Sequence, residues 1–506
     1  MKYLIFLFTF LIHIQLQAQP GSFDQSFGNA GIALGLFPPD FNEGMGVYQQ
    51  SDGKILNVGT ISQASSADDF YLLRYLSDGN LDSSFGTNGS VSGPIGSGND
   101  QALDVIQQAD SKILVVGGYD NPIERDVFIR RYDSIGVLDT SFANNGMVTT
   151  DFQSGGDDVA LRVRIQPDGK ILVCGTTVEI SNFTAAVMIL RYSSDGILDT
   201  SFGNGGKVLF SQLTGDQYFI QFVLQPDGKI VIVGVTEDVN GFNDILVVRF
   251  LPDGSLDNSF NGDGIFTFDL SNDDDEGWAI ALQPDGKILI GGMGITINGV
   301  DDLLIRLDST GYPDPSFNTT GILTKDHNQL DNYITNILLQ ADGKIITVGQ
   351  VSDFVEKISL TRYLASGSDD PGFGNNGSIM HPIANDAYCN SAILQADNRI
   401  VITGWVETAT TSNNFTARFD NDSLFSIVHE LIVSDNRLYP VPASDKIYIK
   451  DLKYGSYAMV FDSRGQIVFH RRIESNSLDL SFLTVGIYLL RVQSDREQFV
   501  QKFVKE

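Results

Sequence analysis

From residue 22 to residue 420 the chain alternates short apolar runs with tight polar turns. Runs such as 112–116, 245–250 and 279–283 are five or six residues long and rich in Val, Ile and Leu, which is typical of strands rather than helices. Most of these runs do not alternate with polar residues, so the strands that they predict are buried on both faces. The pattern therefore predicts an all-β fold in which every sheet is covered on each side.

Three polar markers recur seven times in constant order along this region. The first is a D-x-S-F-G-x-x-G phrase, the second a Q-x-D-G-K-I turn, and the third an arginine at the end of an apolar run. The first and last phenylalanines of the first marker give a mean spacing of (373 − 27)/6, or 57.7 residues. The repeated residues are Phe27, Phe85, Phe142, Phe202, Phe260, Phe317 and Phe373; Asp52, Asp110, Asp168, Asp227, Asp285, Asp342 and Asp397; and Arg74, Arg131, Arg191, Arg249, Arg306, Arg362 and Arg418.

Each repeated unit reads as four strands: one after the first marker, two that flank the Q-x-D-G-K turn, and one that ends at the arginine. The turn predicts a hairpin, because Pro presets φ, Asp accepts the next corner and Gly takes the left-handed position. Ser111 and Asn398 stand where the other units have this Gly. Asn tolerates a positive φ better than most residues.

Seven four-stranded units with apolar flanks are best accommodated by radial stacking, which predicts a seven-bladed β-propeller of four-stranded antiparallel blades over 19–425. An open stack of sheets is the alternative, but its ends need polar caps, and none is evident. The blades are expected to be contiguous in sequence, without an exchanged strand that seals the ring. The run 424–428 either seals the first blade or begins the next domain.

The phrases GILDTSFGNGGKV, LQPDGKIVIVG and ILVVRFLPDG resemble the delta-60 repeat, a family placed among β-propellers. The resemblance covers about 22 to 420. It implies the fold, and it implies no catalytic or ligand-binding residues.

The first 18 residues are typical of a signal peptide. Lys2 supplies the positive start, an apolar run extends from Leu4 to Ile14, and cleavage is expected after Ala18. A membrane anchor is the alternative, but the run is shorter than the ~20 residues that a bilayer span needs. No later segment is long and apolar enough to span, so we expect an exported protein without a transmembrane segment.

Composition shifts after a linker at 426–434, and residues 435–506 hold none of the three markers. This segment resembles the C-terminal sorting domain of the type IX (Por) secretion system, on the pieces Leu438-Tyr439-Pro440-Val441-Pro442, Asp462-Ser463-Arg464-Gly465 and Gly486-Ile487-Tyr488. The resemblance implies a small β-sandwich, recognition by the type IX machinery, and a secreted or outer-membrane-surface location. A generic carbohydrate-binding or fibronectin-like module is the alternative.

Lys and Arg total 33 against 63 for Asp and Glu, a formal charge of −30. This balance argues against nucleic acid or an anionic membrane as the main partner, because both need basic patches. The two cysteines, Cys174 and Cys389, fall in non-neighbouring units and are expected to be separate thiols.

Residues required in every unit are expected to serve the fold, so we interpret the repeated Arg, Asp and Phe as structural. Function is expected where the units differ, on the face opposite to the markers. The acidic run 271–277, with Asp273, Asp274 and Asp275, is a candidate calcium site; otherwise no cofactor is expected. His327 and His381 follow the first strand of adjacent units and are a candidate pair on the same face. The variable loops include 177–185, 237–243, 271–277 and 295–300.

The leading hypothesis is a non-catalytic, exported β-propeller at the cell surface that binds a glycan or a protein through its variable loops. The alternative is an extracellular hydrolase or lyase that acts on polysaccharides with carboxylates at the propeller channel. A third interpretation is a structural surface-layer component. A deep pocket with convergent polar groups would favour the enzyme, whereas a rim of loops would favour binding.

Overall fold

The computed structural model describes residues 19–35, 41–62, 67–152, 155–179, 184–213, 215–384, 386–408, 411–421, 438–450, 457–461, 467–473, 475–493 and 498–506. The chain divides into two compact units, one of Ala18–Asp422 and one that contains Ser423–Glu506. The described residues form strands and no α-helix, so none of them forms a helix that could cross a membrane.

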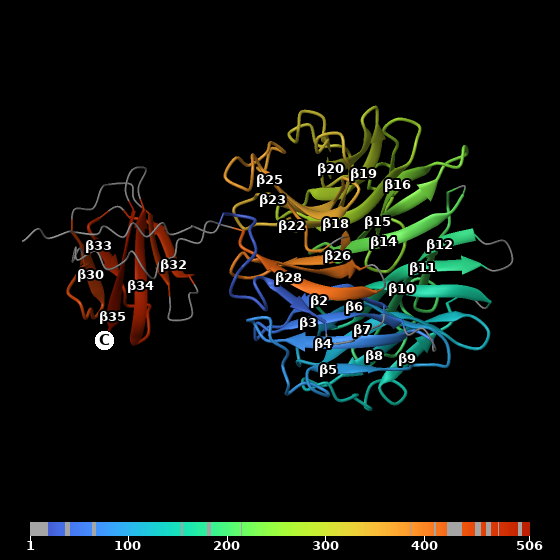
Figure 1. Ribbon diagram of the computed structural model, residues 1–506, viewed down its shortest axis with the longest axis horizontal. Coiled ribbons are helices and arrows are strands. Elements are labelled where there is room, and N and C mark those ends of the chain that lie inside the picture. Colours follow the sequence, from blue (N-terminus) through green and yellow to red (C-terminus); the bar gives the residue numbers. More distant parts are fainter. Residues whose placement is uncertain are drawn as a thin grey trace, which may run out of the picture. The chain divides into compact units, whose positions relative to one another are not determined.

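The first unit contains seven four-stranded antiparallel sheets, the predicted blades (Figure 1). Blades 1 to 4 are β2 (Phe41–Gln49), β3 (Ile55–Ser62), β4 (Asp69–Tyr75) and β5 (Ser90–Gly93); β6 (Asp100–Gln107), β7 (Ile113–Asp120), β8 (Arg125–Tyr132) and β9 (Met147–Thr150); β10 (Gly156–Ile165), β11 (Ile171–Glu179), β12 (Thr184–Tyr192) and β13 (Lys207–Phe210); and β14 (Gln217–Leu224), β15 (Ile230–Glu237), β16 (Asn243–Phe250) and β17 (Ile265–Phe268). Blades 5 to 7 are β18 (Asp275–Leu282), β19 (Ile288–Thr296), β20 (Gly299–Leu307) and β21 (Ile322–Lys325); β22 (Asp331–Leu339), β23 (Ile345–Ser352), β24 (Glu356–Tyr363) and β25 (Ser378–His381); and β26 (Asp386–Leu394), β27 (Ile400–Glu407), β28 (Ser412–Phe419) and β1 (Ile32–Leu34).

The core of this unit lies between neighbouring blades. The first strand of each blade contacts its counterparts in both neighbours, which arranges these strands as the innermost ring. One apolar cluster joins Leu172 and Val187 of blade 3 to Phe222 and Ile232 of blade 4. Because each blade is covered on both flanks, its middle strands are apolar on both faces, as β3 shows with seven consecutive buried residues. The predicted seven-bladed β-propeller is confirmed.

The predicted blade boundaries are wrong by one strand. The strand after each first marker pairs with the arginine-bearing strand before it, so it is the outer strand of the preceding blade, as β5 pairs with β4. The reason is that the first marker connects two strands of the same blade. Its aspartate accepts a hydrogen bond from the arginine eight residues earlier, as Asp82 does from Arg74. The ring is therefore sealed by an exchanged strand, because β1 pairs with β28 through Ile32 opposite Ala417. The run 424–428 lies outside the described residues.

The three markers meet at each blade boundary, as blade 4 illustrates. Arg249 donates from Nε to Asp257 Oδ2 at 2.7 Å and from a terminal nitrogen to the Ser309 carbonyl of blade 5 at 2.6 Å. Its guanidinium carbon lies 4.6 Å from the centre of the Phe260 ring, and Lys229 Nζ lies 3.2 Å from Asp257 Oδ2. In all seven blades the arginine Nε donates to the marker aspartate at 2.7–2.9 Å.

The hairpin turns have the left-handed residue that the sequence predicts. Gly228 has a φ of +86°, and Ser111 and Asn398 occupy the same position with φ of +69° and +67°. A Cβ built on Gly228 would meet no atom closer than 3.3 Å, the Pro252 Cγ. Backbone strain, rather than a clash, therefore limits substitution at this position.

The Gly228→Val variant is expected to lose about 1 kcal/mol or more of unfolding free energy, because a β-branched residue is strained at positive φ. Gly228→Asn is the matched control and should lose clearly less, since Asn398 is accommodated in the equivalent turn. Urea unfolding of the two variants and the parent measures the difference. Equal stability of Gly228→Val and the parent would contradict the turn assignment.

The C-terminal unit is a two-sheet β-sandwich, as predicted. Its core joins Ile447 of one sheet to Val460, Leu490 and Phe503 of the other. The sheets are β29 (Leu438–Tyr439), β30 (Lys446–Ile449) and β33 (Ser477–Asp479), and β32 (Ile467–Arg472), β31 (Tyr457–Phe461), β34 (Gly486–Gln493) and β35 (Gln498–Lys505).

The residues that carry the sorting-domain resemblance take different places in this sandwich. Leu438 is buried in the core, and Tyr488 donates from its hydroxyl to the Thr484 carbonyl at 2.9 Å. Gly486 begins β34, whereas Gly465 lies outside the described residues. Tyr439, Pro440 and Pro442 are exposed.

Candidate functional site

The sheet topology places the connections of the propeller on two opposite faces. In blade 1 the Q-x-D-G-K turn joins β2 to β3 and the first marker joins β4 to β5, so both lie at one end of the antiparallel strands. The loops from β3 to β4 and from β5 to β6 lie at the other end. We call this second side, in all blades, the variable-loop face. Its loops differ in length and sequence between blades, whereas the marker turns repeat.

Asp274, in the acidic run of the variable-loop face, couples two blades. Its Oδ1 accepts a hydrogen bond from the Asn243 backbone amide of blade 4 at 2.9 Å. The residue at the same place accepts from the preceding blade in five further blades. The residue at this position, Asn99 in blade 2 and Asp in the other five, thus belongs to the repeated architecture of the ring.

Asp275 is fully buried at the start of β18, where its Oδ2 accepts a hydrogen bond from the Leu270 amide. Burial, with the negative charges of Asp269 and Asp244, raises the pKa of Asp275 to about 6. Asp100 holds its own loop in the same way in blade 2, through the Ile95 amide. Asp273 is partly exposed and accepts from the Asp274 amide at 3.0 Å. Calcium binding by this run stays a prediction.

The two predicted histidines are both buried, and each has its own set of contacts. His327 Nε2 lies 3.1 Å from Asp302 Oδ2 of β20 in blade 5. His381 Nε2 lies 2.6 Å from the Gly21 carbonyl, and its ring packs against Phe419 of blade 7. Burial lowers the pKa of His381. Each histidine therefore has its own local partner, the Asp302 carboxylate for His327 and the Gly21 carbonyl with the Phe419 ring for His381.

A strip of aromatic residues, which the sequence analysis did not single out, lies on the innermost strands near the variable-loop face. The positions seven and five residues before the turn glutamine are at least partly exposed in every blade. In blades 4 to 7 these positions supply four aromatic residues. We define the aromatic strip as these residues with a neighbouring carboxylate and a tryptophan on β27: Tyr218, Glu276, Trp278, Tyr333, Tyr388 and Trp405.

Four aromatic side chains of the strip contact one another in two pairs. The Trp278 and Tyr333 rings, from blades 5 and 6, meet edge to face with centroids 4.8 Å apart. The Tyr388 and Trp405 rings of blade 7 are stacked with centroids 4.0 Å apart. Both tryptophans of the chain therefore belong to this strip. The signal that marked it in the sequence was an aromatic residue on an inner strand at a position that is polar or aliphatic in other units.

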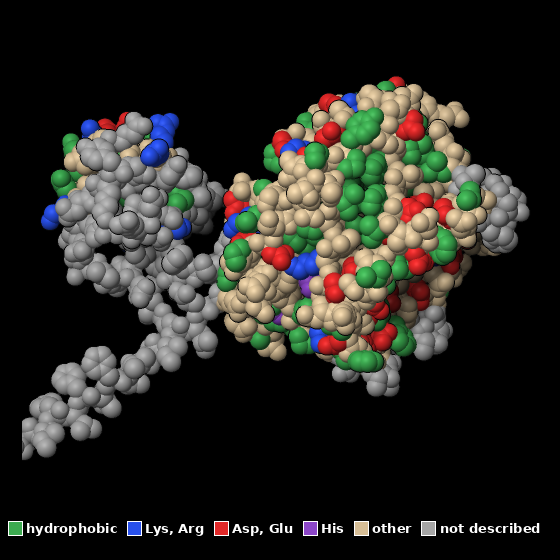
Figure 2. Space-filling view, turned by 90° about the horizontal axis from the view of Figure 1, so that it is seen from above, with side chains coloured by type: hydrophobic (Ala, Val, Ile, Leu, Met, Phe, Trp, Pro, Cys, Tyr) green, Lys and Arg blue, Asp and Glu red, His purple; other side chains and the backbone are tan. Residues whose placement is uncertain are grey.

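Glu276 links the aromatic residues to a pocket. Its Oε2 accepts from Trp278 Nε1 at 2.7 Å, and its Oε1 accepts from Asn243 Nδ2 at 2.8 Å. The pocket has a volume of about 280 Å³ and is lined by Leu161, Tyr218, Asn243 and Glu276, among others. Figure 2 shows apolar side chains gathered in patches among acidic ones on the surface of the propeller. Fixed aromatic faces beside an oriented carboxylate suit a ligand with both apolar C–H faces and hydroxyl groups.

The cysteines offer no reactive site. Cys174 of β11 and Cys389 of β26 are free and buried, as two separate thiols. Burial raises the pKa of Cys174, and of Cys389 to about 12, so both remain protonated at neutral pH.

Two family models match the chain. One is described as a domain of unknown function (DUF5122) beta-propeller and matches residues 50–85, 108–142, 166–202, 225–260, 283–317, 340–373 and 395–424. The other is described as a secretion system C-terminal sorting domain and matches residues 437–506. No curated protein sequence matches the chain.

Several solved structures are similar to the chain in fold. PorZ, a surface component of the type-IX secretion system of Porphyromonas gingivalis, is 12% identical over 90% of this chain and 58% of its own, with a TM-score of 0.39. The chain thus spans 58% of the length of that protein. Virginiamycin B lyase from Staphylococcus aureus is 12% identical over 76% of this chain and 98% of its own, with a TM-score of 0.42. The β-propeller domain of the Trilobed protease from Pyrococcus furiosus is 11% identical over 76% of this chain and 98% of its own, with a TM-score of 0.40.

Proposed function

Because the chain is a DUF5122 β-propeller protein that a type IX sorting domain directs to the cell surface or the extracellular space, we propose that its propeller is a non-catalytic module that binds a glycan there. The binding surface is the aromatic strip on the variable-loop face. The propeller supplies a rigid frame, and the inner-strand side chains that differ between blades supply the specificity.

The observation that carries this proposal is the two aromatic contacts, Trp278 with Tyr333 and Tyr388 with Trp405, together with Glu276, which accepts a hydrogen bond from Trp278. Trp278 and Tyr388 are only partly buried although each is held by a neighbouring ring. An aromatic face that is fixed but open to water can stack on the C–H face of a sugar ring. Glu276, oriented by two donors, is placed to accept hydrogen bonds from sugar hydroxyl groups.

Polysaccharide hydrolysis or elimination is the alternative, and one feature of the acidic groups favours binding instead. Glycoside hydrolysis uses two carboxyl groups that flank the scissile bond. The carboxyl groups of Asp244 and Asp275 both have a pKa raised to about 6, as a general acid requires. Asp244 is partly exposed, whereas the Asp275 side chain is fully buried beneath its own loop. A polymer could not reach Asp275 without opening that loop, so Asp244 and Asp275 could not flank a scissile bond together.

Replacing Trp278 and Tyr388 together with Ala is expected to weaken glycan binding by about tenfold or more, since each aromatic contact contributes roughly 0.5–1.5 kcal/mol beyond its buried area. The parent protein is first screened on a glycan array, and the best ligand is then titrated by calorimetry. Tyr312→Ala is the matched control, because Tyr312 is an exposed tyrosine on the marker face.

Unchanged affinity in the double variant would reject the aromatic strip as the binding surface. An array without any bound glycan would reject the proposed ligand class. Release of reducing sugar by the parent protein would instead support the enzymatic alternative.

A further inference from the structure

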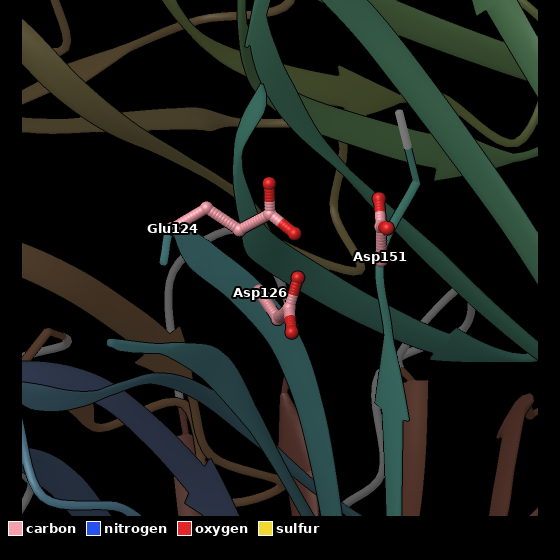
Figure 3. A group of neighbouring side chains, drawn as sticks. All are labelled: Glu124, Asp126 and Asp151. Atoms are coloured by element: carbon pink, nitrogen blue, oxygen red, sulfur yellow. The ribbon is translucent and has the colours of Figure 1, made fainter. Parts of the chain in front are cut away.

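A cluster of three acidic side chains lies at the variable-loop end of blade 2, away from the aromatic strip. Glu124 and Asp126 stand on either side of the first residue of β8, and Asp151 follows the last residue of β9. The two strands pair with Val127 opposite Thr150, which brings the three residues together. One carboxylate oxygen from each lies within 4.8 Å of the others. In Figure 3 the Glu124 side chain extends toward Asp151, with the Asp126 carboxylate beside the gap between them.

Two oxygens of this cluster are buried without a hydrogen-bond donor among the described residues. They are Asp126 Oδ1 and Glu124 Oε2. Asp126 is only 7% exposed. A buried carboxylate oxygen that lacks a donor is costly, and most such atoms in proteins have a partner. Two of them in one cluster of like charges therefore indicate a missing positive partner.

The rest of the Asp126 side chain is held in place. Its Oδ2 accepts from Asn121 Nδ2 at 2.7 Å and from the Tyr119 hydroxyl at 3.3 Å, which leaves Oδ1 as the oxygen without a donor among the described residues. Asn121 Oδ1 in turn accepts from the Glu124 amide at 3.0 Å. Supporting hydrogen bonds that orient a ligand side chain are typical of metal sites.

The basic groups nearest to the cluster are engaged elsewhere. Lys207 Nζ donates to the backbone carbonyls of Asp151 and Phe152, at 2.7 and 3.0 Å, rather than to the carboxylates. The Arg125 guanidinium pairs with Asp120 and donates to Gln101. Neither interaction supplies a donor to Asp126 Oδ1 or Glu124 Oε2.

The repeats show what is special about blade 2. Asp244 and Asp269 of blade 4 occupy the places of Asp126 and Asp151, and their charges interact. The third place, that of Glu124, is Phe242 in blade 4. In the part of the chain that the structure describes, the blade 2 cluster is the group of three acidic side chains close enough to share an ion.

We propose that Glu124, Asp126 and Asp151 bind a calcium ion. The donor atoms are hard carboxylate oxygens, which Ca²⁺ prefers, and no His or Cys is among them. The three side chains would supply part of the shell of six to eight oxygens, and water would complete it. A site of this kind is expected to bind Ca²⁺ with a dissociation constant of about 0.1–1 mM, as in extracellular modules. The ion would tie the outer strand of blade 2 to the β7–β8 turn.

The test is thermal unfolding and calorimetric titration of the full chain with CaCl₂ up to about 10 mM, after treatment with a chelator. Glu124→Gln and Asp151→Asn each replace a carboxylate with a neutral amide, which weakens the site without changing the buried Asp126. Asp244→Asn is the control, since it removes a carboxylate from the equivalent part of blade 4, at the place of Asp126. We expect one Ca²⁺ to bind and raise the melting temperature of the parent and the control, and binding at least tenfold weaker in the two ligand variants.

No calcium-dependent rise in melting temperature would overturn the proposal. So would a rise that persists unchanged in Glu124→Gln and Asp151→Asn, or that disappears in Asp244→Asn. An equal response to MgCl₂ would overturn the assignment to calcium, because Mg²⁺ requires a near-octahedral shell that three fixed carboxylates would not favour over Ca²⁺. The readout is independent of glycan binding.

Discussion

Removal of residues 19–35 from the propeller is expected to abolish the closed ring, because these residues supply β1 and the Asp24 partner of Arg418. Arg418 is buried and donates to Asp24 Oδ2 at 2.7 Å, so its loss of a partner costs about 3–5 kcal/mol. Phe27 is fully buried between blades 1 and 7, and the loss of such a side chain costs a further 3–5 kcal/mol or so. These losses approach the ~5–15 kcal/mol that keeps a domain folded.

The measurement is the melting temperature, with the heat of unfolding, of 19–421 and of the shortened chain. The control is a rearranged chain in which 19–35 follows residue 421 through a flexible linker, which restores the strand from the other end. This chain should recover most of the stability. If the shortened chain melts within a few degrees of the parent, β1 does not seal the ring.

The second large effect is expected from Arg249→Ala. This change leaves Asp257, which is 4% exposed, without its guanidinium partner and removes the donor to the Ser309 carbonyl of the next blade. We expect a loss of about 3–5 kcal/mol in the free energy of unfolding, toward the lower value because Lys229 stays 3.2 Å from Asp257. The free energy of unfolding of Arg249→Lys should lie between those of the parent and of Arg249→Ala. An ammonium group keeps the positive charge, but it cannot make both contacts that the forked guanidinium makes.

Lys357→Ala is the control for this prediction, because Lys357 pairs with Asp353 at a partly exposed position. Lys357→Ala should lower the free energy of unfolding by no more than about 1 kcal/mol. Urea unfolding measures all three variants. An Arg249→Ala loss as small as that of Lys357→Ala would show that the repeated arginine does not hold the blades together.

The pH dependence of stability distinguishes the ion pair from simple packing. Burial raises the pKa of Asp257, but hydrogen bonds from Ser259 and the charges of Lys229 and Arg249 together lower it to about 2. In the unfolded chain the pKa is about 3.9. This carboxylate therefore contributes its full stability above about pH 4 and loses it as the pH falls toward 2. In Arg249→Ala the loss over this range should be smaller than in the parent.

The sequence predicted the seven blades because three markers repeat with the strand pattern, yet it also held the signal for ring closure. The first marker at Asp24 has no arginine strand before it, and Arg418 has no marker after it. In every other unit the arginine and the marker aspartate are eight residues apart, as Arg74 and Asp82 are. Asp24 and Arg418 are thus the two members of one repeated pair. A division of the repeats that starts each unit at the first marker places them in different units.

The candidate sites were harder to predict, because they depend on which strands become neighbours. Asp274 and Asp275 looked distinctive in the sequence, but alignment on the turn glutamine places Asp274 with Asp216 and Asp275 with Asp158 of other units. Trp278 and Tyr333 are 55 residues apart in sequence, and their contact requires two blades to stand side by side. Glu124 and Asp151 likewise meet only after β8 and β9 pair.

The ring-sealing pair also constrains when the protein can finish folding. Asp24 and Arg418 are separated by 394 positions, so the closing contact cannot form before nearly the whole propeller has been synthesised. Until then β1 and one flank of blade 1 have no partner, and the growing chain lacks its most distant stabilising contact. A chain that ends before residue 418 therefore cannot close the ring.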